Sequence, residues 1–162
     1  MKLKNKLLLV TSMILIIAGS SAGQTATKNE VKNPNFDAEL AARLGADKIG
    51  MKNYVLVILK TGPATVAAGK ERDEIFKGHF ANINKLAGEG KLVVAGPFGD
   101  QGVDWRGMFI FNVGTVEEAQ KLTAIDPVIK SGIMVAEFHK LYCSAALLEV
   151  NNIHKKIASE NF

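Results

Sequence analysis

Two kinds of apolar pattern alternate along this chain, and their order restricts the fold more than any other feature. Short runs rich in β-branched and aromatic residues indicate strands. The predicted strands are 54–60 (YVLVILK), 91–97 (KLVVAGP), 107–113 (GMFIFNV) and 133–142 (IMVAEFHKLY). Apolar residues at helical spacing predict helices over about 71–87 and 115–124. The order is therefore strand, helix, strand, strand, helix, strand.

This order is typical of an α+β fold in which four antiparallel strands carry both helices on one face. Two of the strands, 54–60 and 107–113, are apolar at both alternating sets of positions, which indicates burial on both faces of the sheet. Two helices cannot cover both faces. A second subunit facing the sheet is the simplest cover, so the sequence predicts a homodimer with the sheets packed face to face.

The N-terminus has the layout of a secretory signal peptide. Lys2, Lys4 and Lys6 precede an apolar run over 7–18, and small residues follow at 19–23. The run is about 12 residues long, whereas a helix needs ~20 to span a bilayer. We therefore expect residues 1–23 to be cleaved rather than kept as an anchor. The mature protein would be exported to the periplasm or the exterior, with no stable membrane span.

The net charge depends strongly on this leader. The chain has 20 basic and 16 acidic residues, a net charge of +4. Removing the three leader lysines leaves 17 basic against 16 acidic residues, a net charge of +1. Basic residues form no stripe along the sequence, so we expect no nucleic-acid partner.

Composition and spacing divide the rest of the chain into three parts. Residues 24–52 read as a linker followed by a short helix (FDAELAARLGAD) that stops at Gly45. Residues 53–143 contain the predicted sheet and its helices. Residues 144–162 form a tail in which apolar residues at helical spacing predict a terminal helix docked on the body.

The sequence lacks the usual motifs of metal and cofactor sites. No C-x-x-C or H-E-x-x-H spacing occurs, and there is no phosphate loop, dinucleotide fingerprint or serine nucleophile motif. We therefore expect neither a metal nor a cofactor. Cys143 is the only cysteine and cannot form an internal disulfide. It is either buried as a small apolar residue, joined to a second subunit, or reactive.

Three stretches carry a resemblance to a known family. They are HFANINKLAGEGKLVVAGPF (79–98), WRGMFIFNV (105–113) and EEAQKLTAIDPVIKSG (117–132). The shared pattern is a histidine in the first helix, a strand ending Ala-Gly-Pro, Arg-Gly opening the third strand, and Asp-Pro after the second helix. Over about residues 54–142 the chain resembles the YCII-related (YciI-like) family. It departs at Asp-Pro-Val (126–128), where many members have Asp-Pro-Phe. The preceding RLGADKIGMKNY is similar to secreted members.

The resemblance implies a ferredoxin-like βαββαβ fold that pairs into a dimeric α/β barrel. It also implies an active site near the family's histidine and aspartate, which match His79 and Asp126. The family's biochemical role is mostly unassigned. Proteins of the wider fold include lactone isomerases, dehalogenating enzymes and monooxygenases, and an analogy at this level does not transfer a reaction.

His79 and Asp126 each have a catalytic and a structural interpretation. His79 lies near the edge of its helix's apolar face, where an imidazole can move protons near neutral pH or can be a core histidine bonded to a backbone carbonyl. Asp126 precedes a proline and so ends its helix. Its carboxylate can also orient the imidazole of His79, as in a catalytic dyad.

Four further residues are candidates for substrate binding. Arg106 at a cleft mouth can hold a carboxylate with two hydrogen bonds, or it is a solvated surface arginine. Trp105 covers the pocket or lies at a subunit contact. Gly96 and Pro97 end a strand at the predicted cleft, where a missing side chain permits close approach of a ligand.

Three functions follow from these residues. The first is a cofactor-free dimeric enzyme of the isomerase or lyase type, acting on a small organic molecule with His79 and Asp126 as its acid/base pair. The second is a module that binds a small apolar molecule without catalysis. The third is a structural dimer with no pocket of consequence.

Overall fold

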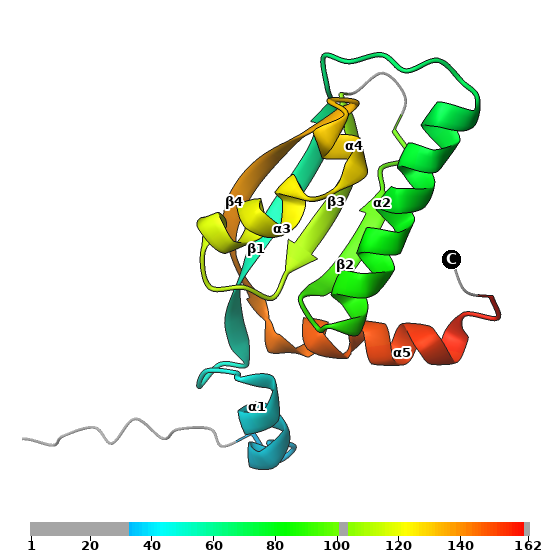
Figure 1. Ribbon diagram of the computed structural model, residues 1–162. Helices are drawn as coiled ribbons and strands as arrows, with labels where there is room; N and C mark the ends of the chain where they lie inside the picture. The colour runs from blue at the N-terminus through cyan, green and yellow to red at the C-terminus, as the bar shows by residue number, and fades with distance from the viewer. Residues whose placement is uncertain (1–32, 101–103, 161–162) are drawn as a thin grey trace, which may run out of the picture. The chain divides into compact units, whose positions relative to one another are not determined.

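The computed structural model describes residues 33–100 and 104–160 (Figure 1). The chain divides into two units, residues 1–36 and Asp37–Phe162. In the first unit the described residues form a turn, closed by a 3.1 Å hydrogen bond from Phe36 N–H to the carbonyl of Asn33. The predicted signal peptide and most of the predicted linker lie outside the described residues. The helices and strands described below belong to the second unit.

The second unit contains helices and strands in the predicted order, with additions at both ends. The elements are α1 (Ala38–Leu44), β1 (Met51–Thr61), α2 (Lys70–Gly88), β2 (Leu92–Pro97), β3 (Trp105–Phe111), α3 (Val116–Ala124), α4 (Pro127–Lys130), β4 (Met134–Ser144), the 3-10 helix η1 (Ala145–Glu149) and α5 (Val150–Ile157). The β1–α2–β2–β3–α3–β4 succession confirms the predicted strand and helix order.

The four strands form one antiparallel sheet in the order β2-β3-β1-β4. The central strand β1 pairs with both β3 and β4, so that Val57 lies between Phe109 and Phe138. The structure therefore confirms the α+β class, and the sheet is compatible with a ferredoxin-like fold.

Helices cover one face of this sheet. Val55, Val57 and Leu59 of β1 alternate toward that face, beside Phe109 and Phe111 of β3. Helices α2, α3 and α4 pack against these residues (Figure 1). Their contributions to the core are Ile83 and Leu86 from α2, Val116, Ala119 and Leu122 from α3, and Ile129 from α4.

The opposite face has a smaller core built partly from the C-terminal segment. Tyr54, Val93 and Ile110 are buried there, and Leu147 and Leu148 of η1 pack against them. Part of the cover that the sequence pattern assigned to a second subunit is thus supplied by the chain itself. The homodimer stays a prediction.

Two local differences from the sequence prediction bear on the candidate residues. Asp126-Pro127 was expected only to end a helix, but a new short helix, α4, begins at Pro127. The third strand was predicted over 107–113, but β3 begins two residues earlier, at Trp105 and Arg106. The second predicted helix, α3, begins with a capping box: the Thr115 hydroxyl accepts from the Glu118 N–H, and the Glu118 carboxylate accepts from the Thr115 N–H.

The segments outside the sheet region contact each other. Helix α1 ends at Gly45, whose positive φ of 63° fits the predicted glycine stop. Arg43 forms a 2.7 Å ion pair with Glu149 of η1, and the Ala145 N–H donates to the carbonyl of Gly50 over 2.9 Å. The N-terminal helix and the C-terminal segment therefore support one another beside the sheet.

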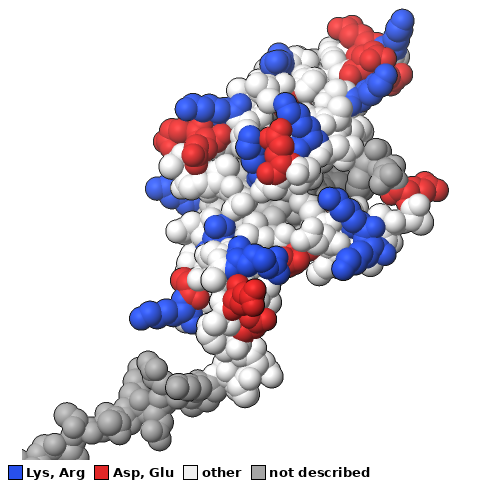
Figure 2. Space-filling model, turned by 60° about the horizontal axis from the view of Figure 1, so that its bottom comes forward, with Lys and Arg blue, Asp and Glu red and all other residues white. Residues whose placement is uncertain are grey.

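Charges of both signs lie close together on the face shown in Figure 2. This agrees with the nearly equal numbers of basic and acidic residues, 20 and 16. Within residues 33–100 and 104–160, no helix is both long and apolar enough to cross a membrane.

Candidate functional site

His79 lies on α2, on the side that faces the sheet. Glu71 and Asp73 in the first turn favour the helix through its dipole. Ile83 and Leu86, four and seven residues after His79, belong to the apolar stripe that packs on the sheet. The same stripe directs His79 inward, and only 7% of this residue is exposed.

Asp126 lies in the junction between α3 and α4. Its backbone is extended (φ −69°, ψ 130°), as expected for a residue that precedes proline. Pro127 occupies the first position of α4, where its missing N–H costs no hydrogen bond. The Asp126 carboxylate caps α4 by accepting a 3.0 Å bond from the Val128 N–H. The helix start therefore fixes where the carboxylate points.

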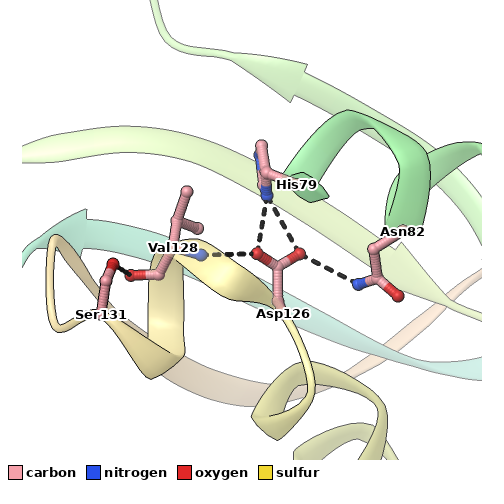
Figure 3. Close-up of polar contacts among 5 residues, drawn as sticks. All are labelled: His79, Asn82, Asp126, Val128 and Ser131. Carbon is pink, nitrogen blue, oxygen red and sulfur yellow. Dashed lines mark hydrogen bonds and ion pairs between the residues drawn. The ribbon is translucent and has the colours of Figure 1, made fainter. Parts of the chain in front are cut away.

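His79 and Asp126 meet although 47 positions separate them in the sequence (Figure 3). The imidazole Nδ1 lies 2.9 Å from Oδ1 and 3.0 Å from Oδ2 of Asp126. The side-chain amide of Asn82, one turn after His79, donates to Oδ2 over 3.0 Å. Asp126 is completely buried. Its two oxygens thus receive two side-chain donors from α2 and one backbone donor from α4.

These contacts decide which imidazole nitrogen can react. A carboxylate accepts hydrogen bonds, so the neutral imidazole keeps its proton on Nδ1. The Nε2 lone pair is then available to a molecule beside the ring. The rings of Phe76, Phe80 and Phe109 lie 6.2, 5.5 and 6.0 Å from the imidazole. These aromatic neighbours pack around one base held in one orientation.

A glycine allows the two helices to approach closely enough for this pair. A side-chain carbon added at Gly78 would lie 2.9 Å from Cγ of Pro127. The proline ring is rigid, so a larger residue would force α2 away from α4. Gly78 and Pro127 are each adjacent to a member of the pair, and their contact sets its distance.

His79 lines a cavity of about 350 Å³ between α2 and the strands β2 and β3, with α5 at one end. Phe76, Phe80 and Ile83 form its helix side, and Leu59 and Phe109 belong to its sheet side. Its polar lining residues are His79, Asn84, Arg106, Asn151 and His154. The cavity is thus mainly apolar with a few polar groups, as small-molecule sites usually are.

Comparison with known proteins identifies the region that contains the pair and most of the cavity wall. A family model described as the YCII-related domain matches residues 53–138, more than half of the chain. The chain belongs to the YCII-related domain family. This confirms the resemblance read from the sequence.

The YCII-related chain is also similar to a solved structure. This is 5-chloro-2-hydroxyhydroquinone dehydrochlorinase from Burkholderia phenoliruptrix AC1100, in complex with 2,5-dihydroxybenzoquinone. The match has 21% sequence identity and a TM-score of 0.42, and it covers 54% of this chain and 92% of the other. A comparison with curated proteins finds no match.

The other predicted substrate-binding residues differ in their relation to the cavity. Arg106, Gly96 and Pro97 line it. Trp105 is not among the lining residues; it is 46% exposed, and its ring lies 5.3 Å from that of Phe98. At Gly96 an added side-chain carbon would meet nothing within 4 Å, so this glycine leaves open space beside the strand.

Sequence reasoning missed two contributors to this region. Asn82 follows His79 by three positions, a spacing that places both side chains on one face of a helix and could have indicated a shared partner. His154 is exposed and also lines the cavity. It lies on α5, outside the YCII-related match. No pattern in the sequence indicates where a terminal helix docks.

His139, the third histidine, lies apart from this site. It is exposed on β4, and its Nε2 lies 2.7 Å from Oε1 of Glu137. Hydrogen bonds from Lys60 and then from His139 hold the pKa of Glu137 below its usual value. Among residues 33–100 and 104–160, no group of three or more His, Cys, Asp or Glu residues is arranged to hold a metal ion.

Proposed function

We propose that this YCII-related protein catalyses proton transfer on a small organic molecule, with His79 as general base and acid. The observation that carries the proposal is the Asp126–His79 pair at the wall of the cavity. Nδ1 lies 2.9 Å from the carboxylate, and the residue belongs to the cavity lining. Asp126 acts as a positioning residue, since it contacts the imidazole and not the substrate.

Isomerisation or elimination next to a carbonyl fits such a site. Nε2 of His79 accepts a proton from the carbon beside the carbonyl, and the C–H electron pair passes into an enolate. Return of the proton to another carbon gives an isomer. Loss of a leaving group, with its electron pair, from the adjacent carbon gives an elimination product. Neither course requires an oxidant or a reductant.

The first step can be tested without knowledge of the substrate. In D₂O, a general base exchanges the protons next to a carbonyl for deuterium, which proton NMR detects. Suitable probes are cyclohexanone, 2-cyclohexenone and 4-oxocyclohexanecarboxylate. We expect at least one to exchange faster with the protein, and His79→Gln to slow that exchange by about 100-fold or more.

His139→Gln is the matched control, because His139 is exposed and pairs with Glu137 rather than with Asp126. It should leave the exchange rate unchanged. Equal exchange by wild type and His79→Gln would exclude His79 as the base.

The mainly apolar cavity also supports a second candidate, a module that binds a small molecule without turnover. In that case His79 donates or accepts a hydrogen bond and nothing more. Saturable binding of a probe that depends on His79, with no deuterium exchange, would favour binding over catalysis.

We further propose that the protein is exported and that it forms a homodimer. Half-buried Leu56 and Met108 lie on the sheet face opposite α2 and support a second copy as the remaining cover. Sedimentation equilibrium of the purified chain measures its mass directly, and a monomer at micromolar concentration would exclude a stable dimer.

A further inference from the structure

The described polar residues that line the cavity include a cation and no anion. Among residues 33–100 and 104–160, Arg106, two histidines and two asparagines line it, and no aspartate or glutamate does. The nearest carboxylate to His79, that of Asp126, is buried behind the imidazole and has its acceptors occupied by His79, Asn82 and Val128. A cavity with a fixed cation and no facing anion favours an anionic ligand.

Arg106 is held in place by a contact that leaves its charge unpaired. Its Nε–H donates to the hydroxyl of Thr61 over 2.6 Å. Among residues 33–100 and 104–160 it has no acidic partner, whereas Arg43 pairs with Glu149 at 2.7 Å. The undescribed residues 101–103 are Gln, Gly and Val and include no acid. Its two terminal nitrogens are therefore the donors that remain for a ligand.

Strand β3 relates Arg106 to the catalytic pair. Arg106 and Phe109 lie three positions apart on this strand, a distance of roughly 10 Å along it. The pairing with β1 shifts register at Arg106, and both residues line the cavity despite their odd spacing. The ring of Phe109 is 6.0 Å from the imidazole of His79. A molecule held by Arg106 would therefore have to extend by about one ring to reach Nε2.

Resting on the function proposed above, we propose that the cavity takes a small organic acid in which one carboxylate is attached to an apolar, ring-sized body. The carboxylate binds to the two terminal nitrogens of Arg106. The body lies between α2 and the strands β2 and β3, with its far carbon beside His79. Two parallel N–H donors match the two oxygens of a planar carboxylate.

Benzoate is a suitable probe, because it has one carboxylate and one ring and does not react with a general base. Benzamide has nearly the same shape and no charge. Ligand-detected NMR gives the affinity of both. We expect wild type to bind benzoate more tightly than benzamide, and Arg106→Gln to weaken benzoate binding by about 10-fold or more.

Arg43→Gln is the matched control, since it removes the same charge at a site outside the cavity lining. It should leave benzoate binding unchanged. Amide shifts on addition of benzoate should be largest at Gly96 and Gly107, which line the cavity.

Three results would overturn the proposal: no benzoate binding at millimolar concentrations, equal affinity for benzamide, or unchanged affinity in Arg106→Gln. These results are independent of deuterium exchange. If deuterium exchange depends on His79 but benzoate affinity does not depend on Arg106, the acid/base function is supported and the carboxylate site is excluded. If benzoate binding requires Arg106 but no carbonyl probe exchanges deuterium, the carboxylate site is supported and the acid/base function is excluded.

Discussion

Asp126 is the residue on which the candidate site depends. It is completely buried and accepts hydrogen bonds from His79, Asn82 and the backbone of Val128. An unpaired carboxylate at this position would be strongly unfavourable, so all three donors stabilise the folded chain as well as the site. The resemblance to a family pointed to His79 and Asp126. Asn82 lies three positions after His79, and this spacing is compatible with a shared partner, but the structure is what shows that the partner is Asp126.

The tautomer of His79 is a testable consequence of this arrangement. Neutral His79 should carry its proton on Nδ1, because Asp126 accepts there, whereas exposed histidines favour Nε2–H. Two-bond proton–nitrogen NMR correlations distinguish the two forms. In Asp126→Asn we expect a shift of the population toward the Nε2–H form. Identical ring spectra in wild type and variant would show that Asp126 does not set the tautomer.

At the scale of elements, the site depends on how closely α2 approaches α4. The sequence indicated α2 correctly, since its apolar spacing is regular and glycines follow it. It did not indicate α4, because the Asp-Pro pair ends one helix and can also begin the next, and only tertiary packing decides between them. The position of α5 at one end of the cavity likewise depends on contacts distant in sequence, such as the 2.7 Å bond from the Asn151 amide to the Leu92 carbonyl.

Two glycines of α2 allow a matched test of this approach. Alanine favours a helix over glycine by about 1 kcal/mol. Gly88→Ala meets nothing within 4 Å and should leave the free energy of unfolding equal or higher. Gly78→Ala would place a carbon 2.9 Å from Pro127, and a clash of this kind costs about 1–3 kcal/mol. We therefore expect Gly78→Ala to lower the free energy of unfolding measured with urea.

The same variant should also weaken the Nδ1–H signature of His79, because α2 moves away from Asp126. If Gly78→Ala is as stable as Gly88→Ala and keeps that signature, the helices adjust to a side chain here and the glycine is not required.

At the scale of the whole molecule, ion pairs and hydrogen bonds connect segments that are distant in sequence. Asp47 accepts from Tyr142 of β4, and this contact is the main cause that lowers the pKa of Asp47. Bonds from Asn152 and then Arg43 lower the pKa of Glu149. Together with Glu137, these carboxylates link α1, β1, β4 and the C-terminal segment.

These lowered pKa values predict the response to acid. A carboxylate whose folded pKa lies below its unfolded value stabilises the fold above the unfolded value, near 4, and loses that contribution as the pH falls through the folded value. We expect the free energy of unfolding to decrease as the pH is lowered below about 4. Lys60→Met should reduce the contribution of Glu137 to this pH dependence, because the hydrogen bond from Lys60 is the main cause that lowers the pKa of Glu137.

Denaturant unfolding at a series of pH values measures this dependence, and added salt should weaken it because these groups are exposed. A free energy of unfolding that stays constant below pH 4 would contradict the prediction.

The sheet was predictable to a greater extent than the cavity. Strands such as β1 and β3 follow from local apolar runs, and their antiparallel order follows from the order of elements. The cavity requires side chains from α2, β2, β3 and α5 to meet, and no local pattern encodes that meeting. Even so, Arg106, Gly96 and Pro97 were singled out from the sequence and line the cavity, while Trp105 does not.

The cavity has a consequence for the motions of α2. A helix above a hollow lacks some of the contacts that a filled core would give it, so it opens locally at lower free energy than the sheet below. Amide hydrogens in α2 should therefore exchange with solvent before those of the central strand β1. A molecule that occupies the hollow slows this exchange in proportion to its affinity. Amide hydrogen exchange in α2 can thus detect a ligand of this protein without an activity assay.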